Sequence, residues 1–279
     1  MKIDPSIRKQ VREALAEDLG RDGDLSTLHF VSPSARLRAR LLAKQNGVLC
    51  GRDLVDEVFR RAAPGSRVSW LVKEGGAFSK GTPLAEISGG RAILSAERTA
   101  LNFLQHLSGI ATLTRAFAER TRGTRASIYD TRKTLPGWRT LAKYAVRIGG
   151  GKNHRMGLHD MVMLKDNHLA ARENLEERVR AFRRRKPRIK IEIEAANAAE
   201  VELALALGAD LIMLDNMHPA ALRRQIAKIR RANPRTEIEI SGGVALASVA
   251  ALARLGPDRI SVGRLTHSAP AVDISMKLE

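Results

Sequence analysis

The chain has 279 residues, 44% of them hydrophobic, which is enough for a folded core in one large α/β domain or in a barrel plus a smaller domain. The formal net charge of +18 raises the alternative of nucleic-acid binding, but aromatic residues make up only 4% and do not alternate with the basic runs, so a base-stacking surface is poorly supported. No apolar run is long enough to span a membrane, and the amino-terminal segment lacks the apolar centre of a secretory signal. The single cysteine, Cys50, excludes an intrachain disulfide and is expected to be a small buried residue, which fits a cytoplasmic protein.

The first part of the chain predicts an α+β unit with a small antiparallel sheet. Apolar residues at helical spacing predict helices at 7–19 and 53–63. Residues 22–27, after the first helix, predict a turn whose acids serve as caps rather than bind a cation. Alternating patterns and glycine-rich turns predict strands at 36–44, 47–50, 68–72 and 83–87. Residues 92–119 predict a long helical region with a break near Ser108-Gly109.

From residue 126 onward the pattern changes to alternating strands and helices. The predicted strands cover 126–130, 161–165, 189–194, 211–215, 237–241 and 259–263, and the predicted helices cover 139–148, 172–185, 197–207, 219–232 and 244–255. Strand–helix units with short connections predict a parallel barrel or barrel-like sheet. The basic run from Arg180 to Arg188 is interpreted as the solvated face and end of a helix rather than a nucleic-acid-binding arm.

Each predicted strand of this second part ends in polar residues, and the carboxyl ends of barrel strands meet at one mouth. Arg132, Arg155 and Lys165 together with His154 are suited to clamp carboxylates or phosphates. Glu194 and Asp215 offer hard oxygen ligands for Mg²⁺ that keeps its waters, or acceptors for ribose hydroxyls. Two further strand ends, Ser241-Gly242-Gly243 and Gly263-Arg264, offer backbone N–H groups to phosphate.

Plainer readings of several residues stay open at this point. Gly149 to Gly151 fits a simple flexible turn, and Asp215 fits a helix cap. His267 fits an ordinary surface histidine, and spacing alone makes Arg98 a structural residue with Glu97 as its partner. The cationic groups, the pair of acids and the two phosphate cradles nevertheless indicate a phosphorylated sugar and an acidic second substrate. No nucleophile–base pair and no dinucleotide fingerprint stands out.

Several motifs closely resemble the quinolinate phosphoribosyltransferase family, also called carboxylating nicotinate-nucleotide pyrophosphorylase. They are DTRKT at 130–134, GGGKNHRMGL at 149–158, LKDNH at 164–168, MLDN at 213–216, SGGV at 241–244 and SVGRLTHSAPAVDIS at 261–275. ERTALNFLQHLSGIAT at 97–112 and GVLCG at 47–51 are similar to the same family, so the resemblance runs nearly end to end. The chain departs from the family pattern at Gly90, Trp138 and Ile148, none of which carries the proposed chemistry.

The resemblance implies an incomplete (βα)6-type parallel barrel at residues 111–267, preceded by an α+β domain at residues 1–110 on which the segment 268–279 packs back. It implies the reaction of quinolinate with phosphoribosyl pyrophosphate to nicotinate mononucleotide, pyrophosphate and CO₂, a step of NAD biosynthesis that uses Mg²⁺. It also implies a homodimer in which Arg98 reaches the neighbouring active site. Assembly beyond the dimer, such as a hexamer of dimers, stays open, and no nucleic acid or membrane partner is expected.

The resemblance also assigns roles within the site. The expected catalytic residues are Lys133, Lys165, Glu194 and Asp215, with Mg²⁺ held by Glu194 and Asp215 through water. The expected substrate-binding residues are these four and Arg98, Thr131, Arg132, His154, Arg155, Ser241, Gly242, Gly243, Val262, Gly263, Arg264 and His267. The nearest alternatives are barrel relatives, namely a molybdenum-transport-associated type and the non-carboxylating nicotinate enzyme. The full set of cations favours the quinolinate enzyme because a second carboxylate needs the additional positive charges.

Overall fold

The computed structural model describes residues 3–170 and 173–279. The chain divides into two compact units, the first formed by Met1–Leu113, Thr140–Gly149 and Ala269–Glu279 and the second by Thr114–Arg139 and Gly150–Ser268. The division predicted between residues 110 and 111 falls inside a single helix, α4 (Ala92–Arg120), which contributes residues to both units. No helix of the described ranges has the length and hydropathy that a membrane crossing requires.

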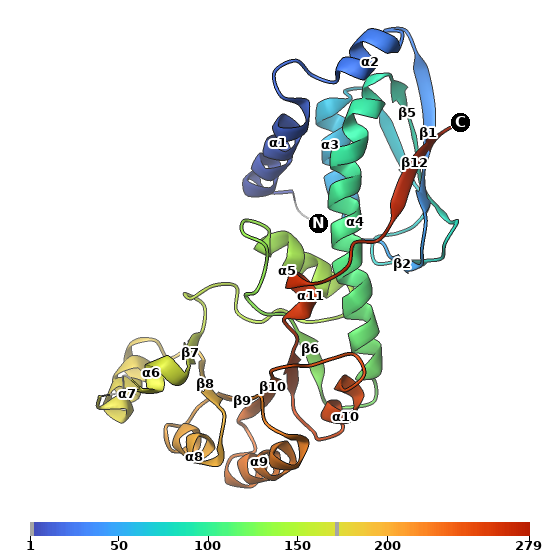
Figure 1. The fold of residues 1–279 in the computed structure, drawn as a ribbon. Coiled ribbons are helices and arrows are strands. Elements are labelled where there is room, and N and C mark those ends of the chain that lie inside the picture. Colours follow the sequence, from blue (N-terminus) through green and yellow to red (C-terminus); the bar gives the residue numbers. More distant parts are fainter. Residues whose placement is uncertain (1–2, 171–172) are drawn as a thin grey trace. The chain divides into compact units, whose positions relative to one another are not determined.

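The first unit is built on a four-stranded antiparallel sheet. Its strand order is β12-β1-β5-β3, with β1 (Arg36–Ala43), β3 (Arg67–Trp70), β5 (Pro83–Gly90) and β12 (Ile274–Leu278). Alternation along β1 buries Ala39, Leu41 and Ala43 and exposes Arg36, Arg38 and Arg40, so these arginines lie on the outer face of the sheet. Strand β12 pairs with β1 at Leu41–Met276, which joins the carboxyl-terminal segment to the sheet (Figure 1).

Helices and a small two-stranded ribbon complete the first unit. They are α1 (Pro5–Leu19), α2 (Leu25–Phe30), α3 (Arg52–Ala62), α5 (Arg139–Ile148) and the two-stranded sheet of β2 (Gly47–Val48) and β4 (Ala77–Phe78). The Asp24 carboxylate accepts the Thr27 N–H at 3.0 Å, so the predicted acidic cap begins a short helix that the sequence pattern did not indicate. Cys50 is fully buried, as predicted.

Helix α4 is continuous, so the break predicted at Ser108-Gly109 is wrong. Both residues serve close packing instead. The buried Ser108 hydroxyl accepts the Cys50 N–H at 3.1 Å, and a Cβ added at Gly109 would lie 2.2 Å from the Pro270 carbonyl oxygen. Glycine is present here because backbone from the carboxyl-terminal segment passes directly against the helix.

The second unit contains a six-stranded parallel sheet in the order β6-β11-β10-β9-β8-β7. The strands are β6 (Ser127–Tyr129), β7 (Val162–Leu164), β8 (Ile191–Ala195), β9 (Leu211–Asp215), β10 (Glu237–Ser241) and β11 (Arg259–Ser261). Each predicted strand is present, and among the described residues the edges of β6 and β7 do not pair with each other. The structure therefore has the incomplete parallel barrel that the sequence predicted.

Helices follow the strands of this sheet, and Figure 1 shows α8 and α9 covering its outer side. The helices are α6 (Asp166–Ala170), α7 (Leu175–Arg185), α8 (Ala198–Ala206), α9 (Pro219–Ala232), α10 (Val249–Ala253) and α11 (Arg264–His267). The predicted start of a helix at residue 172 lies outside the described residues. Three arginines, Arg183 to Arg185, form the last turn of α7, which agrees with their interpretation as a helix end. Helix α10 is shorter than predicted because the loop after β10 continues past its two glycines.

Candidate active site

A cavity of about 850 Å³ opens at the carboxyl ends of the barrel strands. It is lined by every residue that the sequence assigned to the mouth of the barrel: Thr131, Arg132, Lys133, His154, Arg155, Lys165, Glu194, Asp215, Ser241, Gly242, Gly243, Val262, Gly263, Arg264 and His267. All of them belong to the second unit. Arg98 is the exception, because it is exposed on α4 in the first unit. Residues from six different strand ends and one loop are thus gathered around one space.

The loop that carries His154 and Arg155 is fixed by pairing with the open edge of β6. Lys152 forms a parallel bridge with Tyr129, and its N–H donates to the Ile128 carbonyl oxygen at 2.7 Å. The fully buried Asp130 carboxylate accepts the His154 N–H at 2.9 Å and the Asn153 side-chain amide at 2.5 Å. The loop therefore takes the position of a neighbouring strand, and it presents its next residues at the mouth of the barrel.

Two arginines give one part of the cavity its positive charge. Arg155 is held by the Met161 carbonyl oxygen at 3.1 Å from its Nη1 atom. Burial and, after it, the positive charge of the neighbouring Arg132 lower the pKa of Arg155, the direction expected of two cations that repel each other. A bound anion relieves that repulsion, so this part of the cavity is suited to a carboxylate or a phosphate.

Opposite charges meet at the next two strand ends. Lys165 follows β7, and its ammonium lies 2.5 Å from a carboxylate oxygen of Glu194 on β8. Asp215 ends β9 and accepts the Asn216 side-chain amide at 2.6 Å. One contact leaves two of the three ammonium protons of Lys165 available, so the same side chain can also hold a substrate anion.

Two glycine-containing loops close the other side of the cavity. Gly242 has a φ of +91°, and a Cβ there would lie 2.8 Å from the Asn216 backbone nitrogen, so a side chain is excluded by strain and by space. A Cβ on Gly263 would meet the side chains of Lys133 and His267, both at 3.2 Å. The Thr266 hydroxyl donates to the Lys133 carbonyl oxygen at 2.6 Å and links the loop after β6 to the loop after β11. Close backbone approach of this kind is typical of phosphate-binding loops.

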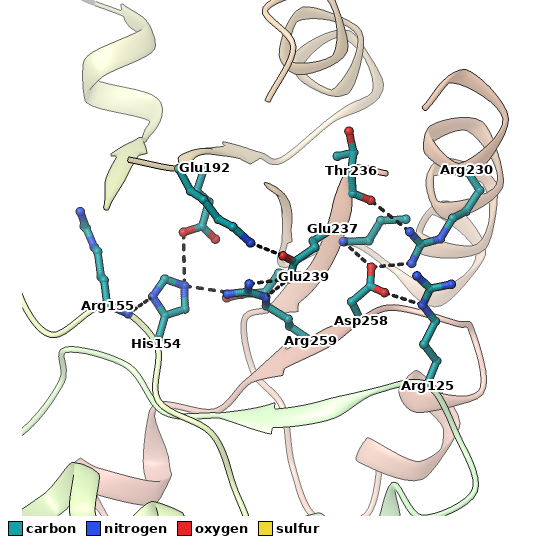
Figure 2. A network of polar contacts seen from close by, with 12 residues as sticks. Arg125, His154, Arg155, Glu192, Arg230, Thr236, Glu237, Glu239, Asp258 and Arg259 are labelled. Atoms are coloured by element: carbon teal, nitrogen blue, oxygen red, sulfur yellow. Dashed lines mark hydrogen bonds and ion pairs between the residues drawn. The ribbon is translucent and has the colours of Figure 1, made fainter. Parts of the chain in front are cut away.

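A buried charged cluster is formed by His154, Glu192 and Glu239, of which His154 and Glu239 also line the cavity (Figure 2). The Nε2 atom of His154 is 3.2 Å from a Glu192 oxygen and 3.3 Å from a Glu239 oxygen. Burial would lower the pKa of His154, but the two carboxylates outweigh it and raise the pKa to about 9. Burial and the charge of Glu239 raise the pKa of Glu192 to about 7. Barrel interiors are usually filled by branched apolar side chains, so these charges are out of the ordinary.

The sequence pattern places Asp130 and Glu192 among the polar strand ends but gives no chemical role to them or to Glu239. Glu192 and Glu239 were visible only as acids inside otherwise apolar strands, IEIEA and EIEIS. Their alternation with isoleucine places them on the face opposite the apolar residues, which points toward a polar barrel interior. This alternation was the only indication in the sequence that the two acids point into the barrel. Because ordinary half-exposed strands show the same alternation, it does not identify them as site residues.

Glu194 and Asp215 are the residues that fit the expected Mg²⁺. They line the same cavity from neighbouring strands, and carboxylate oxygens are the ligands that Mg²⁺ prefers. Two carboxylates leave most coordination positions to water and to substrate oxygens, as is usual for Mg²⁺ on phosphorylated substrates. The one group of three metal-ligating side chains found in the described part of the chain is His154, Glu192 and Glu239.

A parallel strand–helix barrel with a cationic cavity at the carboxyl ends of its strands defines a class of enzyme that acts on small anionic substrates. Family profiles described as the N-terminal and C-terminal domains of quinolinate phosphoribosyl transferase match residues 24–108 and 110–277. The chain belongs to the quinolinate phosphoribosyltransferase family.

Individual relatives are similar to this chain in sequence over nearly its whole length. The carboxylating nicotinate-nucleotide pyrophosphorylase of Mycobacterium leprae is 41% identical over 98% of this chain and 97% of its own. A probable enzyme of the same name from Synechocystis is 40% identical over 99% of this chain and 92% of its own. The crystal structure of nicotinate-nucleotide pyrophosphorylase from Ehrlichia chaffeensis has a TM-score of 0.92 and 35% identity, and it covers 100% of both chains.

Proposed function

We propose that this protein transfers the phosphoribosyl group of phosphoribosyl pyrophosphate to quinolinate with loss of CO₂. The products are nicotinate mononucleotide and pyrophosphate, and the reaction is a step of NAD biosynthesis. The observation that carries the proposal is a single cavity that joins a cluster of cations to two glycine loops suited to phosphate. The names of the relatives in Mycobacterium leprae and Synechocystis, both carboxylating pyrophosphorylases, agree with it.

Quinolinate is a pyridine with two adjacent carboxylates, and the cations at the mouth match its charge. Arg132 and Arg155 are close enough to repel each other, so a dicarboxylate placed between them is stabilised by both. Lys165 adds a third cation while it keeps its contact with Glu194. His154 lines the same part of the cavity and completes the quinolinate subsite.

Phosphoribosyl pyrophosphate occupies the other part of the cavity in this proposal. Ser241 to Gly243 and Val262 to Arg264 hold the 5′-phosphate through backbone N–H groups, with His267 beside them. Lys133, which the Thr266 hydroxyl holds next to Gly263, neutralises the departing pyrophosphate together with Thr131. Mg²⁺ held by Glu194 and Asp215 would supply further neutralisation of pyrophosphate and ribose oxygens.

The bond changes follow from this placement. The ring nitrogen of quinolinate attacks C1 of the ribose, and the bond from C1 to the pyrophosphate oxygen breaks, with the electron pair leaving on pyrophosphate. Glu194 and Asp215 orient the ribose hydroxyls and stabilise positive charge at C1, as carboxylates do in glycoside hydrolysis. The carboxylate next to the ring nitrogen then leaves as CO₂, because the pyridinium accepts the electron pair of the broken C–C bond. The ring carbon that carried this carboxylate takes a proton from solvent. Positioning of the two substrates supplies much of the rate.

We also propose that the enzyme acts as a homodimer in which Arg98 completes the quinolinate subsite of the partner subunit. Arg98 is an exposed arginine on α4, beyond the lining of the cavity in the second unit. An exposed arginine on a rigid helix is a suitable hydrogen-bond donor to a carboxylate of the quinolinate that is bound in a neighbouring copy of the chain.

The function is tested with quinolinate labelled at the carboxylate next to the ring nitrogen. Incubation with phosphoribosyl pyrophosphate and Mg²⁺ is expected to release labelled CO₂ and to form nicotinate mononucleotide in equal amounts. Release of label without the nucleotide, or no release at all, would contradict the proposal.

A further inference from the structure

The buried cluster of His154, Glu192 and Glu239 joins two strands through one imidazole ring. Glu192 lies on β8 and Glu239 on β10, with β9 between them. Both carboxylates have a side-chain exposure of 0%, and that of His154 is 4%. No hydrogen bond reaches the four carboxylate oxygens from the described residues, and their contacts with His154 are ion pairs (Figure 2).

The two nitrogens of the His154 ring have different neighbours. Nδ1 accepts the backbone N–H of Arg155 at 2.7 Å, and Nε2 faces the two carboxylates. In the neutral ring that accepts at Nδ1, the proton is on Nε2. The imidazolium carries a proton on both nitrogens, so only the contacts of Nε2 are common to the two forms. Nε2 therefore donates toward Glu192 and Glu239 in both protonation states.

This arrangement argues against a cation between the three side chains. Their ligand atoms lie within 4.8 Å of one another, a spacing that would suit a divalent metal. A metal needs an unprotonated Nε2, however, and the Arg155 N–H already occupies Nδ1 as an acceptor. A metal at Nε2 would move the ring proton to Nδ1, where it would lie against the Arg155 N–H.

Two buried carboxylates beside a site for a dicarboxylate need an explanation, because their charge opposes that of the substrate. The contacts supply one. The carboxylates fix the angle of the His154 ring through Nε2, and Arg155 is the next residue of the same loop. Arg155 and His154 both line the cavity in the part suited to anions.

We propose that Glu192 and Glu239 are positioning residues for quinolinate, which act on it only through the orientation of His154 and Arg155. The inference rests on the proposed function for its substrate, and it assigns the two acids a role in affinity for the dicarboxylate. What matters in this role is the reach of each side chain to Nε2 rather than its negative charge.

Paired substitutions separate reach from charge. Glu192→Asp and Glu239→Asp keep the charge but withdraw the carboxylate by one methylene group, so the contact with Nε2 is lost. Glu192→Gln and Glu239→Gln remove the charge but keep an oxygen within reach of Nε2. The matched controls are Glu237→Asp and Glu237→Gln, which alter another carboxylate of β10 that pairs with Lys190 and Arg259 and does not contact His154.

The measurements are KM for each substrate, kcat, and calorimetric binding of quinolinate alone. We expect each Asp variant to raise KM for quinolinate about tenfold, because one ion-pair contact that orients His154 is lost, with KM for phosphoribosyl pyrophosphate unchanged. The Gln variants are expected to stay within about twofold of the unchanged enzyme, and the Glu237 variants to lose thermal stability without a change in KM for quinolinate.

Opposite results would overturn the inference. A lower KM for quinolinate in the Gln variants would show that the carboxylates only repel the substrate. An equal rise of KM for quinolinate in the Asp variants and the Glu237 variants would show that a general loss of stability is the cause. If the Asp variants do not fold, the Gln variants still decide between reach and charge. Absence of turnover by the unchanged enzyme would instead refute the proposed function, so the two failures are distinguishable.

Discussion

At the scale of single residues, Asp130 is the anchor of the candidate site. It ends the β6 region and holds the loop of Asn153 and His154 through both carboxylate oxygens. The carboxylate is fully buried, so neither contact competes with water. A buried carboxylate that accepts two N–H groups is a strong local constraint because each is a hydrogen bond to a charged group.

Asp130→Asn is therefore expected to lower the free energy of unfolding by about 2–3 kcal/mol, because the new amide group turns an N–H toward one of its two donors. Urea denaturation measures the change. Asn153→Ala removes only one of the two contacts and should cost about half as much. An unchanged unfolding midpoint in Asp130→Asn would show that the loop is held by its backbone pairing with β6 alone.

Asp258 gives a pH dependence with a defined sign. Its Oδ1 accepts Arg125 at 2.5 Å, and its Oδ2 accepts Arg230 at 2.5 Å and the Ile238 N–H at 2.8 Å. Burial alone would raise the pKa of Asp258, but these contacts outweigh it and lower the pKa below the usual 3.8. The folded protein therefore binds fewer protons here than the unfolded chain. The stabilisation is fully present above the usual value and is lost as pH falls through the lowered one.

Asp258→Asn should accordingly cost about 2 kcal/mol of unfolding free energy at neutral pH, and the difference from the unchanged protein should shrink below about pH 4. Urea denaturation at several pH values measures it. The exposed Asp22 provides a control, and Asp22→Asn should change little at any pH. A difference that grows on acidification would contradict the assignment of the charged partners.

At the scale of elements, Gly109 shows how helix propensity and packing oppose each other. Alanine in place of glycine inside an exposed helix stabilises it by up to about 1 kcal/mol. At Gly109, however, the added Cβ would lie 2.2 Å from the Pro270 carbonyl oxygen and 3.0 Å from the Ala271 Cα atom. Both contacts are with backbone, so relief requires the carboxyl-terminal segment to move.

Gly109→Ala is expected to destabilise the protein by about 1–3 kcal/mol and to make the segment that leads into β12 more sensitive to limited proteolysis. Gly90→Ala is the control, because the nearest atom to its added Cβ is 3.9 Å away. A gain of stability in Gly109→Ala would contradict this expectation. It would mean that the carboxyl-terminal segment moves at little cost and that the higher helix propensity of alanine decides the stability of α4.

The sequence predicted the second unit better than the first because the patterns that mark the strands of the second unit are local in the sequence. Each barrel strand is a short apolar run with polar residues at its end, and those ends converge for any parallel strand–helix repeat. The site residues Lys165, Glu194 and Asp215 follow from that rule alone. The assignments of Arg98 and His267 came from the family resemblance rather than from spacing.

Other features depend on partners far away in the chain, which local patterns do not contain. Lys152 acts as a strand neighbour of Tyr129 only because β6 is left at an open edge. Glu192 and Glu239 meet through His154 after three separate elements have assembled. The sequence predicts a helix break at Gly109, whereas the residue contacts Pro270, 161 residues further along the chain.

At the scale of the whole molecule, the proposed homodimer predicts complementation between inactive variants. Arg98→Ala and Arg132→Ala should each abolish turnover of quinolinate while the protein stays folded. Equal amounts mixed and allowed to exchange subunits should recover about a quarter of the original activity, because half of the dimers are mixed and each mixed dimer has one intact site. Steady-state turnover before and after mixing measures it. No recovery, with subunit exchange shown independently, would contradict the sharing of Arg98.

The central claim is that the barrel mouth binds a pyridine dicarboxylate and joins it to a phosphoribosyl group. The most direct measurement is turnover monitored by ultraviolet absorbance, with phosphoribosyl pyrophosphate, Mg²⁺ and either quinolinate or nicotinate as the acceptor. We predict turnover with quinolinate and none with nicotinate, because the cations that hold the second carboxylate are left without a partner when it is missing. Turnover with nicotinate, or with neither acceptor, would contradict the account.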